Sequence, residues 1–133
     1  MKLFPVKMMV LGDARGEILS SDEPLSLLGG VDPKTGAIVE REHPLSGQRV
    51  AGVILGLPHS KGSTVGSYVL YSLSTRGNAP SAIIMKKADM IVATGCVLGR
   101  IPMATVDERA WKELRKSSFG ELISKSSTLA LSE

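Results

Sequence analysis

The stretch that decides the fold runs from Arg49 to Tyr68 and reads Arg-Val-Ala-Gly-Val-Ile-Leu-Gly-Leu-Pro-His-Ser-Lys-Gly-Ser-Thr-Val-Gly-Ser-Tyr. Residues 50–57 are apolar apart from glycine, which predicts a buried strand. A helix is predicted over 65–73, because Val65, Tyr68, Val69 and Leu73 share one helical face. The Gly/Ser turn between them, with Ser63 at its tip, aims backbone N–H groups and a positive helix end at one place. This is the geometry of an anion-binding site.

The rest of the chain predicts more strands and one further helix. Turn residues separate apolar runs that predict strands at 3–11, 16–21, 37–40, 81–85 and 90–93. A second helix is predicted over 106–116, where Thr105 and Glu108 form a capping-box pattern. Residues 117–133 leave three alternatives open: a short helix over 121–125, a docking strand or a frayed tail. The pattern indicates a mixed α+β fold, mostly β, with one or two main helices.

Composition limits the classes of protein to which the chain can belong. A chain of 133 residues with 43% apolar and 22% charged residues predicts one globular domain over 1–133, with 117–133 as a possible C-terminal extension. The chain has no apolar run of membrane-spanning length and no signal-peptide pattern, so we expect a cytoplasmic protein. The net charge of +3 is scattered and only five residues are aromatic, which disfavours nucleic-acid binding.

The single cysteine limits metal chemistry. Cys96 has no second cysteine for an internal disulfide or for a zinc or iron–sulfur site. His43 and His59 lack the short spacing of a zinc motif. Any metal that this protein uses is therefore expected to be held mostly by another chain, and Cys96 itself is predicted to be a small buried apolar residue.

Ser63 has two interpretations from the residues alone. Its spacing favours a helix cap, whereas a role as base or nucleophile needs an activator, because a serine hydroxyl is a weak acid. His59, Lys61 and the helix N–H groups are the candidate activators. Lys61 is a candidate anion contact, although loop lysines are more often solvated, and Gly62 suggests a close approach of the backbone.

Several motifs recur together, in order, in a known family. The chain resembles the small, swivelling-domain subunit of the aconitase X family over residues 15–103. The motifs that carry the resemblance are Leu28-Gly-Gly-Val-Asp-Pro-Lys-Thr-Gly36, His43-Pro-Leu-Ser-Gly47, Lys61-Gly-Ser-Thr-Val-Gly-Ser67, Gly77-Asn-Ala-Pro80 and Ala88-Asp-Met-Ile91.

The resemblance implies a swivelling β/β/α fold and a large partner subunit that carries a 4Fe-4S cluster. It implies a hydro-lyase that dehydrates mevalonate 5-phosphate to trans-anhydromevalonate 5-phosphate in a modified mevalonate pathway of isoprenoid biosynthesis. It also implies that Ser63 is the catalytic base, and we expect Lys61, Gly62 and Thr64 to contact the substrate. Two alternatives stay open: a dehydratase for another hydroxy acid or a hydroxyproline, and a non-catalytic anion-binding module.

Overall fold

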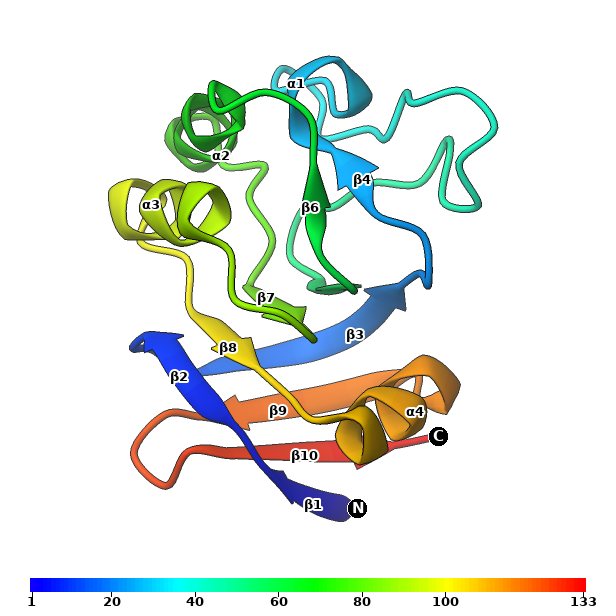
Figure 1. The fold of residues 1–133 in the computed structure, drawn as a ribbon, viewed down its shortest axis with the longest axis vertical. Helices are drawn as coiled ribbons and strands as arrows, with labels where there is room; N and C mark the ends of the chain where they lie inside the picture. Colours follow the sequence, from blue (N-terminus) through cyan, green and yellow to red (C-terminus); the bar gives the residue numbers. More distant parts are fainter.

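One eight-stranded sheet organises the chain, and a computed structural model describes it over residues 1–133 (Figure 1). The strand order is β1-β10-β9-β3-β5-β7-β8-β2, with a separate two-stranded sheet of β4 and β6. The strands are β1 Lys2–Pro5, β2 Lys7–Val10, β3 Ala14–Ser20, β4 Leu25–Ser26, β5 Ile54–Leu57, β6 Ser60–Lys61, β7 Ala82–Met85, β8 Met103–Thr105, β9 Phe119–Ile123 and β10 Thr128–Ser132. The helices are α1 Leu27–Gly30, α2 Gly66–Thr75, α3 Met90–Gly99 and α4 Glu108–Lys116.

The first strand pair nearly closes the sheet into a barrel. β1 pairs with β10 and β2 pairs with β8, so consecutive strands lie on opposite edges of the sheet. Val6 makes the crossing, and its N–H donates to the Ser127 carbonyl at 2.9 Å. The run predicted as one strand over 3–11 is thus two strands, and each covers an edge that would otherwise be open.

Strands β3, β5, β7 and β8 are parallel and form the centre of the sheet. Side chains alternate between the two faces of a strand, so Leu55 and Ile83 enter a core cluster with α2 and α3, whereas Ile54 and Ile84 enter a second cluster with Trp111 of α4. Helices cover both faces here, which explains why β5 and β7 are fully buried apolar runs.

The mixed, mostly β fold predicted from the sequence is confirmed, but several of its elements differ from the prediction. The strand predicted over 90–93 is wrong, because these residues begin helix α3, which Asp89 caps by accepting a hydrogen bond from the Val92 N–H at 2.8 Å. A short apolar run fits a buried helix as well as a strand, and only the cap separates the two. The capping box at Thr105 is also wrong, since the Asp107 carboxylate accepts from the Ala110 N–H at 2.9 Å.

Two further differences lie in residues 117–133 and 37–40. Residues 117–133 contribute β9 and β10, and β9 pairs with β3 as well as with β10. The helix alternative over 121–125 is therefore wrong. The predicted strand over 37–40 is reduced to two isolated bridges, Val31 with Ile38 and Ala37 with Arg49.

Glycines let α2 and α3 pack closely. Gly95 and Gly99 of α3 face α2, and the Ser74 hydroxyl donates to the Gly99 carbonyl at 2.6 Å. A Cβ placed on Gly95 would lie 3.0 Å from both the Leu70 Cβ and the Ser67 carbonyl oxygen. This packing holds the first turn of α2, and hence the end of the Gly/Ser turn, against α3.

Candidate functional site

The predicted anion-binding turn lies on the surface, between β6 and α2. Ser63 is exposed, and its hydroxyl oxygen accepts a hydrogen bond from the Val65 N–H at 3.1 Å, while its carbonyl accepts from the Gly66 N–H at 3.0 Å. Helix α2 begins at Gly66 and has Val65 in the cap position, so the prediction of Ser63 as the helix cap is wrong by two residues. Ser63 stabilises the turn that precedes the helix, and its hydroxyl faces solvent.

Lys61 is held by a carboxylate. Its ammonium lies 2.7 Å from Glu40 Oε2, and the other carboxylate oxygen of Glu40 accepts from the Ser26 N–H at 2.8 Å. Ser26 and Lys61 are also partners in the parallel β4–β6 pairing. Glu40 therefore ties together the two strands that support the turn, a role that the sequence analysis missed.

These contacts change the ionisation of Glu40. Partial burial opposes ionisation of its carboxyl, but the hydrogen bond from Lys61, the Ser26 N–H and the nearby positive charge outweigh it and hold the pKa of Glu40 below its usual value. A depressed pKa in the folded state means that the carboxylate stabilises the fold above the unfolded-state pKa. That stabilisation is lost as the pH falls through the folded-state pKa.

We expect Glu40→Gln to have a lower midpoint of thermal unfolding than wild type at neutral pH. In acid this difference between the two proteins should disappear. The difference between the variant and wild type should shrink once the pH falls below about 4.3, the usual pKa of a glutamate. Glu42→Gln is the matched control, since Glu42 takes part in none of the four ion pairs of the chain. A Glu40→Gln deficit that stays constant from pH 7 to pH 3 would contradict this assignment.

Gly62 meets two demands at once. Its φ of +98° lies in the left-handed region, which favours glycine, and an added Cβ would come within 2.6 Å of the Ser26 Oγ. Ser26 Oγ in turn donates to the Leu28 carbonyl at 3.0 Å. The close approach predicted for Gly62 is thus confirmed as an approach to β4.

Asp89 links the start of the turn to α3. The Ser60 hydroxyl donates to one oxygen of Asp89, while the other oxygen caps α3. The start of the turn is consequently held by two carboxylates, Glu40 at Lys61 and Asp89 at Ser60. An aspartate directly before an apolar run is an N-cap signature, and that signal was available in the sequence.

The two histidines have separate places. His43 is buried, its Nδ1 accepts from the Leu45 N–H at 3.1 Å, and its Nε2 lies 3.3 Å from the Glu23 carbonyl. This pattern fits a neutral ring with the proton on Nε2. His59 is exposed and its Nδ1 lies 2.9 Å from the Ser60 carbonyl, so this nitrogen bonds to the backbone and not to Ser63.

The residues that follow α2 hold a loop in place. Asn78 Nδ2 donates to the carbonyls of Pro33 at 3.2 Å and of Lys34 at 3.0 Å. Asp32 Oδ1 accepts from the Lys34 N–H at 3.0 Å, which forms an Asx turn. These two side chains therefore shape the 32–36 loop.

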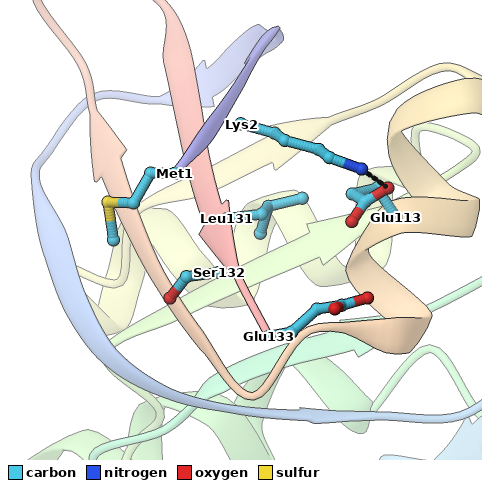
Figure 2. Close-up of a pocket in the computed structure, with 6 residues that line it drawn as sticks. All are labelled: Met1, Lys2, Glu113, Leu131, Ser132 and Glu133. Atoms are coloured by element: carbon cyan, nitrogen blue, oxygen red, sulfur yellow. Dashed lines mark hydrogen bonds and ion pairs between the residues drawn. The ribbon is translucent and has the colours of Figure 1, made fainter.

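The pocket of the structure is not at this turn. Figure 2 shows it where the two chain ends meet α4, with Lys2 paired to Glu113 at 3.2 Å beside Leu131 and Glu133. Its lining carries no histidine and no anion-binding turn. We place the candidate site at the exposed 59–68 turn, because the chemistry that the sequence predicts is there.

The chain's own residues do not suit a metal cluster. No group of three or more His, Cys, Asp and Glu side chains could hold a metal ion. Cys96 is fully buried in α3, and burial raises the pKa of its thiol to about 12, whereas a cluster ligand must be a thiolate. The prediction of Cys96 as a small buried apolar residue is confirmed. Separately, none of the helices is long and apolar enough to span a membrane.

The comparisons with known proteins decide the family. The model of the aconitase X swivel domain matches residues 3–131. This chain belongs to the aconitase X swivel-domain family. The match includes β9 and β10, which lie outside the residues 15–103 that carry the resemblance in sequence.

Relatives and solved structures agree with this family. The chain is 54% identical over 95 residues to the phosphomevalonate dehydratase small subunit of Thermococcus gammatolerans, covering 71% of this chain and 72% of that protein. It is 45% identical over 112 residues to the protein of that name from Methanosarcina mazei, covering 84% and 78%. The crystal structure of Thermococcus kodakaraensis aconitase X in its holo-form superposes with a TM-score of 0.90, at 38% identity and full coverage of both chains.

Proposed function

We propose that this chain is the small subunit of a hydro-lyase that dehydrates mevalonate 5-phosphate to trans-anhydromevalonate 5-phosphate in a modified mevalonate pathway. The observation that carries the proposal is identity of about one half, over some seven tenths of the chain, to phosphomevalonate dehydratase small subunits of several organisms. The aconitase X swivel-domain family supports the same class of reaction.

Ser63 is the residue that we assign as the base. Dehydration breaks a C–H bond next to the carboxylate and the neighbouring C–O bond. The electrons of the C–H bond form the C=C double bond, the proton goes to the Ser63 Oγ, and hydroxide leaves. Proton and hydroxide together make one water, so the atoms balance.

The turn favours the ionised form of Ser63 that this step needs. The Val65 N–H already donates to its hydroxyl oxygen at 3.1 Å, and a hydrogen bond donated to an oxygen stabilises negative charge on it. The first turn of α2, a ten-residue helix, adds the positive end of its dipole. A partner surface that excludes water would strengthen both effects, because the local dielectric constant falls.

Lys61, Gly62 and Thr64 are the residues that we assign to substrate binding. One proton of the Lys61 ammonium is directed at Glu40, which leaves two donors for an oxygen of the substrate carboxylate or phosphate. Gly62 brings backbone to the surface without a side chain, and Thr64 is exposed next to Ser63. Glu40 is a positioning residue here, because it sets where the lysine points.

The remaining parts of the enzyme belong to its partner. We place the 4Fe-4S cluster on the large subunit, a division supported by the single, fully buried cysteine of this chain. The name "small subunit" that the relatives carry also supports such a partner. The same proposal puts the complex in the cytoplasm and leaves nucleic acids and membranes out of its function.

Anaerobic reconstitution with the large subunit tests the function. We expect the complex, and neither subunit alone, to convert mevalonate 5-phosphate to an unsaturated product, followed by absorbance of the new double bond and by mass loss of one water. A panel of other hydroxy acids and hydroxyprolines is the matched control. Turnover of one of these, with none of mevalonate 5-phosphate, would assign the chain to a different dehydratase. A colourless chain that binds anions tightly alone, with no turnover in the complex, would indicate a non-catalytic module.

A further inference from the structure

Helices α2 and α3 contain no charged residue. Their sequences are Gly-Ser-Tyr-Val-Leu-Tyr-Ser-Leu-Ser-Thr over 66–75 and Met-Ile-Val-Ala-Thr-Gly-Cys-Val-Leu-Gly over 90–99. Helices on the surface of a soluble domain usually carry charged residues on the side away from the core. Helix α4 is the contrast, because six of its nine residues are charged.

The outer side of α2 and α3 is apolar and exposed. We define the α2–α3 face as six side chains, each at least 45% exposed: Val65, Tyr68, Tyr71, Met90, Val97 and Leu98. The two helices lie side by side on one side of the sheet (Figure 1), and Gly95 and Gly99 hold them close together. The face is thus a rigid surface, and aromatic residues and methionine are the types enriched at protein interfaces.

This face is continuous with the proposed catalytic turn. Val65 donates its N–H to the Ser63 hydroxyl and is 45% exposed, and Tyr68 follows one turn later at 65%. A partner that reaches Ser63 must therefore approach beside the first turn of α2.

Positive charges border the face. Lys86 and Lys87 precede α3, and Arg76 and Arg100 end α2 and α3. Lys86 is paired with Glu108 at 3.3 Å, which leaves the other three as the basic rim. Two copies of this chain docked through the same face would bring like charges together, whereas an acidic partner rim would be complementary.

We propose that the α2–α3 face docks on the large subunit, against an apolar surface bordered by acidic side chains. This inference rests on the proposed function, because it takes the large subunit as the partner. Docking here covers Val65 and Tyr68, places the partner next to Ser63 and closes the catalytic turn to water.

Binding of the full-length small subunit to the reconstituted large subunit tests the proposal. In Tyr71→Glu and Val97→Glu a carboxylate enters the apolar centre and faces the acidic rim, so we expect the dissociation constant to rise at least about ten-fold in each. Leu3→Glu is the matched control, because Leu3 is 65% exposed on β1 and lies outside the face; its affinity should equal that of wild type. Circular dichroism and thermal unfolding of each free variant check its fold.

A neutral double variant, Tyr71→Ser with Val97→Ser, covers the case in which an inserted charge unfolds the chain, and it should weaken binding by a similar factor. Wild-type affinity in the folded variants would overturn the proposal. So would a small subunit that dimerises through this face while it binds the large subunit normally. The wild-type subunits could instead form a tight complex that Tyr71→Glu disrupts but that leaves mevalonate 5-phosphate unchanged. That result would support the docking face and refute only the proposed function.

Discussion

Ser63→Ala should leave the two-subunit complex assembled and reduce its turnover of mevalonate 5-phosphate by about a thousand-fold, within the range that general-base catalysis contributes. The substitution removes the only atom of this residue that can take the proton. It also removes the acceptor of the Val65 N–H in an exposed turn, which costs the fold about 1 kcal/mol or less. The measurement is kcat in the anaerobic complex, together with complex formation by size-exclusion chromatography.

Ser63→Asn separates the base from a merely structural role. An asparagine side chain offers an oxygen to the Val65 N–H, but it has no group that takes a proton near neutral pH. We expect this variant to be as inactive as Ser63→Ala while the turn keeps its hydrogen bond. Near-normal turnover in either variant would rule out Ser63 as the base, and recovery in Ser63→Asn alone would leave Ser63 with the structural role only.

Gly95→Ala should destabilise the free small subunit by about 1–3 kcal/mol, the usual cost of overpacking a core. The new Cβ would lie 2.7 Å from Leu70 Cδ1 and 3.0 Å from the Ser67 carbonyl oxygen, which belongs to the backbone of α2 and cannot move alone. Alanine is a better helix former than glycine by about 1 kcal/mol, so helix propensity alone would make the variant more stable. A net loss of stability therefore means that the steric clash outweighs this gain. Chemical denaturation monitored by circular dichroism measures the change.

Gly66→Ala is the matched control for this prediction. Gly66 is also buried in a helix, but the nearest atom to an added Cβ is the Leu27 Cβ at 3.4 Å, an ordinary contact. The same substitution should therefore be neutral or slightly stabilising here. Equal effects at the two positions would show that close α2–α3 packing does not govern stability.

Only part of the candidate site could be predicted from local sequence. The strand, turn and helix from residue 50 to 75 and the exposed Ser63 at the turn follow from apolar runs and from the concentration of Gly and Ser. Glu40 was not predictable in this way, because its partner Lys61 is distant in the sequence and only the tertiary fold brings Glu40 beside the β4–β6 pair. The same holds for the contact between Ser60 and Asp89.

The helices show the same limit. α4 was predicted because its apolar residues recur at helical spacing on an otherwise charged surface. α3 was predicted as a strand, since Met90–Ala93 is apolar at every position and has no periodicity. Its helical form follows from its place between β7 and β8, which are parallel neighbours and need a crossover connection.

The sequence by itself determined the apolar core strands, the Gly/Ser turn with Ser63, the absence of a second cysteine and, through its ordered motifs, the family. Those features follow from composition, from local residue patterns and from the order of motifs along the chain. The tertiary structure alone decided the near-closure of the sheet, the anchoring of the turn by Glu40 and Asp89, and the uncharged α2–α3 face. Each of these depends on pairing and packing between distant segments, because strand partners and helix neighbours are selected by the burial that the whole fold achieves.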